Sequence, residues 1–185
     1  MALAITSTPS DELLTVSDAK RHLRLLSDDW DDEIASLIRA ARDDCERDTG
    51  RTFRTSTTRT YKTCDWWCGE WVPPFPPLLG ITSVTYYDAD NASQTLASTN
   101  YVVVLSADGH GRVVWATDAT LPALYDRPDA ITVTFTTGYA SLDVVPPVAV
   151  QAMKLKLTDL FGVGSGSEQK SARDLLGKVD VTSYA

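Results

Sequence analysis

Apolar residues recur at helical spacing in three segments of the chain, and helix boundary signals flank them. The predicted helices span 15–25, 31–49 and 147–161. The apolar face of the longest consists of Ile34, Leu37, Ile38, Ala41 and Cys45. Thr15 and Asp18 form a variant of the capping box, and Gly50 is suited to a left-handed helix end. The pattern therefore predicts two helices near the N-terminus and one near the C-terminus.

Between these helices the apolar period changes to two, which is typical of half-buried strands. Threonine, tyrosine and valine are prominent in the segments 53–63, 81–87, 101–105, 111–115 and 131–137. Turn sequences separate them, most clearly Asp88–Asn91 and Asp108–Gly111. Short strands joined by tight turns indicate an antiparallel sheet. The predicted fold class is α+β: a small helical domain with an antiparallel sheet of about five strands inserted at 52–138.

The two ends of the chain are less regular. Residues 1–13 are small and polar and predict a leader that docks or frays. Residues 162–167, Gly-Val-Gly-Ser-Gly-Ser, have the composition of a flexible linker. The segment after it has too few apolar residues for a core of its own, so we expect an extended tail that orders only against another surface. The sequence predicts one folded domain, 1–161, followed by a linker and tail, 162–185.

The composition is that of a globular protein with an acidic balance. The 185 residues suffice for one core, and 43% of them are hydrophobic and 23% charged. The net charge is −8, and residues 28–48 hold nine Asp and Glu against three arginines. Free nucleic-acid binding is disfavoured because neutralising phosphates requires a basic surface. The N-terminus has neither a basic start nor a long apolar run, so we expect a soluble protein made in a cytoplasm.

The cysteines and histidines do not predict a metal centre or a catalytic site. Cys45 lies on the apolar side of a predicted helix, whereas the spacing of Cys64 and Cys68 permits a disulfide or half a zinc site. The imidazoles belong to His22 and His110, neither of which has zinc-finger spacing or a neighbouring nucleophile motif. We therefore expect free thiols in a reducing compartment, no metal and no catalytic residues.

Three further patterns resemble binding motifs without completing them. The acidic run 28–33 lacks the glycine of a calcium loop, so a solvated helix start is the better interpretation. The Lys-Ser pair that ends 164–171 lacks the glycine and the preceding strand of a phosphate-binding loop. The run 73–77, Pro-Pro-Phe-Pro-Pro, lies between two strands and predicts a rigid connection more than a polyproline ligand. No cofactor is expected, and the protein is not expected to be an enzyme.

The segment 64–80 is unusually rich in tryptophan and proline. It contains three of the five tryptophans, four of the nine prolines and a phenylalanine within the proline run. The large aromatic side chains are Trp66, Trp67, Trp71 and Phe75. Indole rings are favoured at interfaces, and a stiff segment loses little entropy on docking. We expect these side chains to form an interface with another subunit, with folding over the chain's own sheet as the alternative.

Several segments occur in a fairly specific order along the chain. They are Leu-Thr-Val-Ser-Asp-Ala-Lys-Arg-His-Leu-Arg-Leu at 14–25, Asp-Asp-Glu-Ile-Ala-Ser-Leu-Ile-Arg-Ala-Ala-Arg at 31–42, Glu-Arg-Asp-Thr-Gly-Arg at 46–51, Pro-Pro-Leu-Leu-Gly-Ile-Thr-Ser-Val-Thr-Tyr-Tyr-Asp-Ala-Asp at 76–90, Tyr-Val-Val-Val at 101–104, Ile-Thr-Val-Thr-Phe-Thr-Thr-Gly-Tyr at 131–139 and Val-Pro-Pro at 145–147. Over about residues 13–161 the chain resembles the head-tail connector, or adaptor, proteins of tailed bacteriophages and related gene transfer agents.

This resemblance implies a structural virion protein that forms a ring, typically of twelve subunits, beneath the portal protein. Such a ring extends the DNA channel and provides the docking surface for the tail or its stopper. DNA passes through it without sequence-specific binding, and no membrane is involved. The implied location is the neck of the virion, at the head-tail interface, after assembly in the host cytoplasm. The alternative is a β-sheet module whose exposed aromatic residues bind a carbohydrate or another ligand.

The resemblance also assigns roles to residues. In the family the C-terminal segment reaches into the portal, and here the residues for that contact are Leu175, Leu176, Val179, Val181 and Tyr184. The aromatic segment becomes an inter-subunit or tail-interface loop. The acidic residues Asp43, Asp44 and Asp48 would line the channel if their helix faces the lumen. Carboxylates there repel phosphates, so that DNA slides without sticking.

Overall fold

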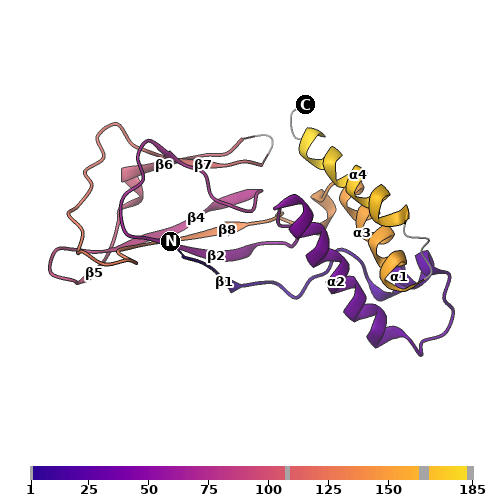
Figure 1. Ribbon diagram of the computed structural model, residues 1–185. Coiled ribbons are helices and arrows are strands. Elements are labelled where there is room, and N and C mark those ends of the chain that lie inside the picture. The colour runs from indigo at the N-terminus through magenta and orange to yellow at the C-terminus, as the bar shows by residue number, and fades with distance from the viewer. Residues whose placement is uncertain (1, 107–108, 163–166, 183–185) are drawn as a thin grey trace. The chain divides into compact units, whose positions relative to one another are not determined.

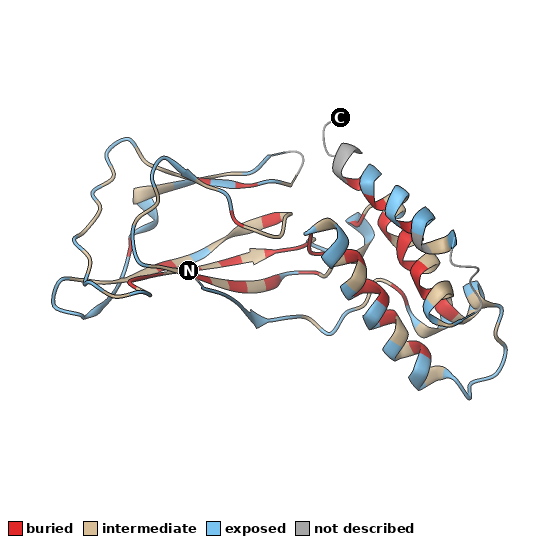
Figure 2. Cartoon of the chain, in the orientation of Figure 1, coloured by how far each residue is buried: buried red, intermediate tan, exposed pale blue. Residues whose placement is uncertain are grey.

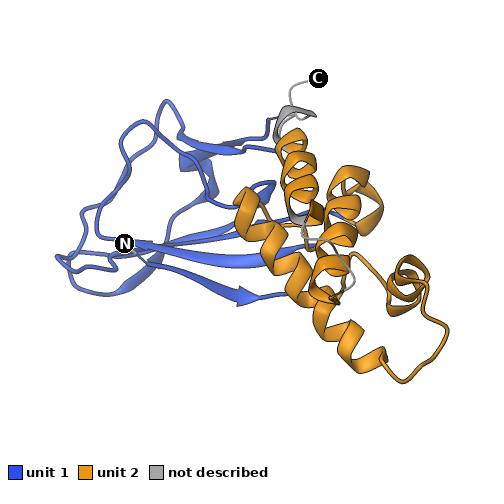
Figure 3. Ribbon diagram, turned by 45° about the vertical axis from the view of Figure 1, so that its right-hand side comes forward, with its two compact units in different colours: residues 1–9, 55–140 blue, residues 10–54, 141–185 orange. Residues whose placement is uncertain are grey.

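The computed structural model describes residues 2–106, 109–162 and 167–182, and the chain divides into two compact units. Unit 1 comprises Met1–Pro9 and Thr55–Ala140, and unit 2 comprises Ser10–Arg54 and Ser141–Ala185 (Figure 3). The strands that the structure describes belong to unit 1, and the α-helices belong to unit 2. The predicted α+β class is therefore confirmed.

Unit 1 is built on a five-stranded antiparallel sheet with strand order β1-β2-β8-β4-β5 (Figure 1). Its strands are β1 (Ala2–Ser7), β2 (Thr57–Thr63), β4 (Leu78–Tyr87), β5 (Ser93–Thr95) and β8 (Ile131–Thr137). The central strand β8 alternates buried and half-buried residues, as a strand with one face on a core should. That core consists of Tyr61, Leu78, Val84, Leu96, Ile131, Val133 and Phe135.

A second sheet has three antiparallel strands, in the order β3-β7-β6. They are β3 (Glu70–Trp71), β6 (Tyr101–Val104) and β7 (Arg112–Trp115). The sequence pattern predicted one sheet of about five strands. A five-stranded sheet is present, but two of the predicted strands belong to the second sheet instead. The segment 111–115 pairs with 101–105 and with β3; antiparallel strands a few residues apart in the sequence commonly form a hairpin. The expected leader at 1–13 instead contains strand β1, which pairs with β2.

Unit 2 contains the helices α1 (Val16–Leu23), α2 (Asp31–Thr49), α3 (Pro147–Leu160) and α4 (Ser167–Thr182), and the short 3-10 turn Leu142–Val144 precedes α3. The predicted capping of α1 is confirmed, since the Thr15 hydroxyl accepts a hydrogen bond from the Asp18 amide at 3.1 Å. Arg24 then ends α1 in a left-handed conformation, two residues before the predicted end. Helix α2 has the predicted bounds, with Gly50 as its left-handed cap.

The prediction of an extended C-terminal tail is wrong for residues 167–182, which form α4. Helix α4 packs against α3 and α2. Its residues Ala172, Leu176 and Val179 are buried at helical spacing. Figure 2 shows red, buried positions along α2, α3 and α4. A single apolar stripe suffices to dock α4, because α2 and α3 supply the rest of the core.

Candidate functional site

The residues that the structure describes include no group of three or more His, Cys, Asp or Glu side chains placed to hold a metal ion. None of the helices in the described ranges combines the length and the hydropathy that a bilayer crossing requires. The carboxylates at the start of α2 are engaged with a cation, since Lys20 bonds to Asp28 and, at 2.8 Å, to Asp31. The candidate functional features are therefore surfaces and side-chain clusters, and two of them contain residues singled out from the sequence.

The first feature is an aromatic cluster in unit 1, which we define as Trp66, Trp67, Trp71 and Trp115. Trp67 stacks on Trp115 with ring centroids 4.0 Å apart and an interplanar angle of 14°. Trp66 meets the edge of Trp115 at 5.5 Å, and Trp71 lies 5.6 Å from Trp67. The three tryptophans of the 64–80 segment are partly buried and pack against the core of the five-stranded sheet. This arrangement supports the alternative of folding over the chain's own sheet.

Two hydrogen bonds fix the loop that carries Trp66 and Trp67, called the aromatic loop below. The indole N–H of Trp66 donates to the carbonyl of Pro122 at 3.0 Å, and the indole N–H of Trp115 donates to the carbonyl of Trp67 at 3.0 Å. Phe75 lies in a left-handed conformation with the guanidinium of Arg59 4.4 Å from its ring centroid. The indole nitrogens of Trp66 and Trp115 are thus satisfied, whereas the buried indole nitrogen of Trp67 has no hydrogen-bond partner among the described residues. An interface role for the area that remains exposed stays a prediction.

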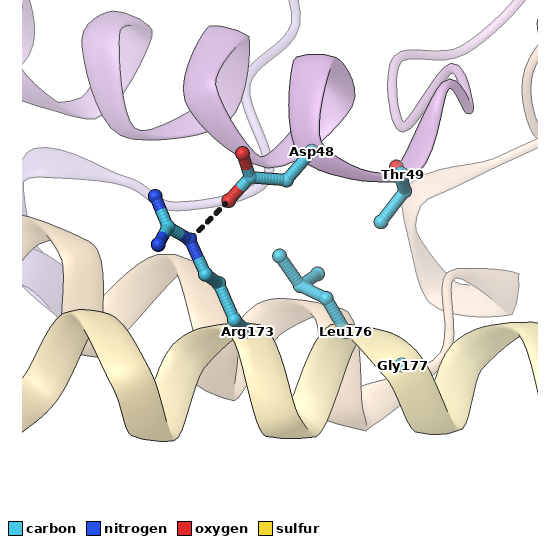
Figure 4. Close-up of a pocket in the computed structure, with 5 residues that line it drawn as sticks. All are labelled: Asp48, Thr49, Arg173, Leu176 and Gly177. Atoms are coloured by element: carbon cyan, nitrogen blue, oxygen red, sulfur yellow. Dashed lines mark ion pairs between the residues drawn. The ribbon is translucent and has the colours of Figure 1, made fainter.

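The second feature is an ionic cluster in unit 2 around Lys156, whose side chain is 3% exposed. Its ammonium bonds to Asp44 and, at 2.6 Å, to Asp48. Arg173 of α4 lies 3.5 Å from the same Asp48 carboxylate, and Figure 4 shows this ion pair beside Leu176. A cleft of about 320 Å³ opens here, lined by Asp48, Thr49, Arg173, Leu176 and Gly177. Residues of α2, α3 and α4 therefore meet at the Asp48 carboxylate.

The electrostatics of this cluster follow from its burial. Desolvation lowers the pKa of Lys156, but the hydrogen bonds that its ammonium donates to Asp44 and Asp48 outweigh that effect, so the pKa is raised above its usual value. The same ammonium is the main cause that holds the pKa of Asp48 below its usual range. Lys156 stays charged, and Asp48 stays ionised well into the acidic range. At neutral pH the cluster is an ionic link between α2, α3 and α4.

Asp43 belongs to a different ionic group, centred on the buried side chain of Arg42. The guanidinium bonds to Asp43 at 2.6 Å, to Glu12 at 2.7 Å and to Glu46 at 3.2 Å. The three residues predicted to line a channel thus divide between two clusters that hold unit 2 together. Asp43 and Asp44 keep 57% and 44% of their side-chain surface exposed, and Asp48 keeps 24%. Their position relative to a channel stays a prediction.

The residues predicted for portal docking do not form one exposed surface. Leu176 and Val179 are each 2% exposed, whereas Leu175 is half-buried. The side chain of Val181 and the whole of Tyr184 lie outside the described residues. The sequence pattern could have revealed the buried pair, because Ala172, Leu176 and Val179 recur at helical spacing.

Several exposed apolar residues were not singled out from the sequence as functional. In unit 2, Leu26 is 99% exposed, Trp30 52% and Leu160 45%. In unit 1, Ile5 of β1 is 57% exposed and Leu3 is 40% exposed. The alternation of Leu3 and Ile5 with smaller residues was a usable strand signal. The fully exposed Leu26 has no such signal, because a leucine after a helix end is equally common in a core.

The cysteines are free thiols, with Cys45 buried and Cys64 and Cys68 exposed. Burial raises the pKa of the Cys45 thiol to about 12. The two exposed thiols flank the loop that carries Trp66 and Trp67. Cys45 is therefore unreactive at neutral pH, and the exposed pair is accessible.

Over nearly its whole length the chain has the same fold as chains in solved structures of gene transfer agent necks. No protein-family model and no curated protein matches the chain. Among solved structures, a chain from the neck of an empty gene transfer agent particle, computed with C6 symmetry, has a TM-score of 0.79 at 21% identity, covering 97% of this chain and 95% of that one.

Two further structures agree. A chain from the virion of a native gene transfer agent particle has a TM-score of 0.77 at 23% identity, with 96% of this chain and 94% of that chain covered. A chain from the neck of the native particle, computed with C12 symmetry, has a TM-score of 0.76 at 22% identity, with 97% and 94% covered. At these identities the likeness establishes the fold, and it extends over nearly the entire chain.

Proposed function

We propose that this chain is a structural neck protein of a tailed-phage or gene transfer agent particle. It forms a ring, of twelve subunits, below the portal protein. The ring extends the DNA channel and provides the docking surface for the tail or its stopper. The observation that carries the proposal is the extent of the structural likeness, 97% of this chain and 95% of a neck chain at a TM-score of 0.79. A likeness of that extent includes both units rather than one common module.

A ring is the assembly that best fits the comparisons. Two of the similar chains come from necks computed with C6 and C12 symmetry. The exposed apolar residues also support assembly, because Leu26 and Trp30 gain free energy only where a partner covers them. A ring of twelve such chains carries a charge on the order of −100 from the net −8 of each copy. Asp43 and Asp44 remain exposed enough to contribute to a field that repels DNA phosphates.

Docking to the portal is assigned to the C-terminal segment. The half-buried Leu175 can contact a partner without rearrangement of α4. Leu176 and Val179 would first have to leave α2 and α3, since both are buried within unit 2. Val181 and Tyr184 complete the assignment made from the resemblance. The sharpest test therefore changes Leu175 and leaves the packed face of α4 intact.

The experiment combines the purified chain with the portal protein of its own particle and images the complex by electron microscopy. End-on class averages should show a twelve-fold ring on the portal. The Leu175→Asp variant should bind the portal at least about tenfold more weakly, because a charge replaces a buried apolar contact. Val144→Asp, at a residue that is 58% exposed in the same unit, is the matched control and should bind normally. A chain that stays monomeric beside the portal, or that binds a carbohydrate instead, contradicts the proposal.

A further inference from the structure

Strand β1 is exposed along its entire length. It consists of six residues, Ala2–Ser7, and all six are exposed, on both faces of the strand. It pairs on one side with β2, and in the described part of the chain no strand pairs with its outer side. An edge strand with neither face packed depends on its ladder hydrogen bonds alone and presents unpaired backbone groups. Figure 1 shows it at the margin of the sheet, next to β2.

The register of β1 places its apolar residues on the core side of the sheet. Leu3 lies opposite Tyr61, which in turn lies opposite Val133 of β8. Tyr61 and Val133 belong to the buried core, so Leu3 and Ile5 continue the same apolar face beyond it. Their side chains nevertheless remain 40% and 57% exposed. The apolar face of this sheet therefore extends past the part that unit 1 covers itself.

A second open edge occurs on β4. On its outer side, the amide of Leu78 donates to Gly109 at 2.9 Å, and the carbonyl of Val84 accepts from Leu96 at 2.8 Å. Strand β5 pairs with β4 only from Thr85 to Tyr87. Between these points, residues 79–83 have no strand on that side within the ranges that the structure describes. A Cβ built on Gly80 points out of the face of the sheet and meets nothing within 4 Å, so a larger residue fits at this position.

The two open edges match in length, sequence and charge. Residues 3–7 read Leu-Ala-Ile-Thr-Ser, and residues 79–83 read Leu-Gly-Ile-Thr-Ser. Neither stretch contains a charged residue or a proline, two of the devices that protect an edge from pairing. Each does contain a register shift, between Ile5 and Ser7 in β1 and, in β4, between Leu78 and Gly80 and between Ile81 and Ser83. The uncharged, proline-free sequence of each edge is therefore compatible with pairing to a strand of another copy.

We propose that β1 of one copy of this chain pairs in antiparallel fashion with residues 79–83 of β4 in the next copy, joining the sheets around the ring. Strand direction alternates across β1-β2-β8-β4, because every neighbouring pair is antiparallel. Strands β1 and β4 therefore run in opposite directions. A rotation about an axis along the strands preserves direction, so β1 of a neighbour arrives antiparallel to β4. The inference rests on the proposed function, since a head-to-tail contact of two different edges closes only in a ring.

Cysteine cross-linking tests the pairing. Cys64 and Cys68 are first replaced by serine, and Cys45 is left because it is buried. Ala4→Cys is then combined with Gly80→Cys, two positions on the face of the sheet opposite the core. Opposed Cβ atoms of antiparallel strands lie about 4.5–5.5 Å apart, close to the distance that a disulfide bridges. The chain is assembled on its portal, oxidised with copper phenanthroline and run on a non-reducing gel.

The expected result is a ladder of covalent multimers beyond the dimer. Its yield should exceed, by about tenfold or more, that of the control pair Ala4→Cys with Val102→Cys, since neighbours in a ring hold the thiols at a high effective concentration. Combining Thr6→Cys with Gly80→Cys tests the adjacent register on the same face. Rings without a ladder in either register overturn the pairing and leave the proposed function standing. Dimers from Ala4→Cys alone indicate β1–β1 pairing and also overturn it. A chain that neither cross-links nor forms rings on the portal overturns both.

A charge on the open edge provides a second measurement. Thr82 is exposed, so Thr82→Lys should leave the stability of the monomer unchanged. An edge lysine opposes strand addition, and the fraction of chain in rings should fall about tenfold or more. Val102→Lys, at a strand residue that is 49% exposed in the other sheet, should assemble normally. Full assembly of Thr82→Lys would overturn the pairing.

Discussion

Trp67 is surrounded by three other indole rings, at centroid distances of 4.0, 5.6 and 6.5 Å. Because its ring stacks on Trp115 and packs over the sheet, Trp67→Ala should reduce the free energy of unfolding of the isolated chain by about 3–5 kcal/mol. Urea unfolding followed by far-ultraviolet circular dichroism measures it. Trp30→Ala is the matched control and should cost less, since Trp30 is 52% exposed. Unchanged stability with lost assembly would instead make the loop an interface element.

Asp48 gives the acid sensitivity of unit 2 a specific origin. Its pKa in the folded chain lies below the ordinary value of 3.8, chiefly because Lys156 donates to it. A lowered folded pKa contributes stability that is fully present above the unfolded pKa and is lost as the pH falls through the folded one. Between pH 6 and pH 3, the urea midpoint of the wild type should therefore fall more than that of Asp48→Asn. Equal falls would show that the Lys156 pair contributes nothing.

The sequence patterns identified the side chains that form clusters, but they did not reliably predict the partners that those side chains contact. An indole is suited to its own sheet or to a partner's surface, so the composition of the 64–80 segment could not decide between them. The pairing of Lys156 with Asp44 and Asp48 spans 112 and 108 residues and leaves no local spacing signal. Asp44 and Asp48 were therefore assigned to a channel lining, although both bind a buried cation.

At the scale of elements, α4 should contribute to the stability of unit 2. Leu176→Ala should cost about 2–5 kcal/mol, because a fully buried leucine leaves a cavity against its neighbours. Leu175→Ala, one position away and half-buried, should cost much less. Thermal unfolding monitored at the helical circular dichroism band compares them. If both variants unfold like the wild type, α4 is not docked in solution.

Elements with a strong local signal were predicted, whereas β1 and α4, whose local signal is weak, were not. Helix α2 has its apolar stripe, its acidic first turn and its glycine cap within one stretch of sequence, and its bounds were predicted to the residue. Strand β1 forms only because β2 provides a ladder more than fifty residues away. Helix α4 follows a glycine-rich stretch that is typical of a linker, and it is docked by three buried residues. Segments of low intrinsic signal take their structure from what they pack against.

At the scale of the whole molecule, the net charge of −8 should oppose ring formation between free copies. Raising the salt from roughly 0.1 M to roughly 1 M shortens the screening length from about 10 Å to about 3 Å. The fraction of chain in rings should rise over this range, as measured by analytical ultracentrifugation. Urea unfolding of the monomer in the same buffers separates screening from an effect on the fold. Rings that dissociate in salt would show that ion pairs between copies dominate.

The sequence predicted a sheet inserted at 52–138 into a helical domain, but it did not predict that residues 1–9 belong to the unit that contains the sheet. The chain passes between the units at 9/10, 54/55 and 140/141, and the first of these points shows no change of period and no glycine-rich linker. Long-range contacts define such a boundary, and the local pattern does not record them. The order of segments along the chain nevertheless predicted a likeness that extends over 97% of its length.

The difference in exposure between the cysteines allows the wild-type chain to be labelled at one loop. Because Cys45 is buried with a pKa of about 12, a maleimide dye at neutral pH should react with Cys64 and Cys68 alone. Both flank the aromatic loop, so the wild-type chain can be labelled there without an engineered site. A slower rate of labelling after assembly would then indicate that a neighbouring subunit covers that loop.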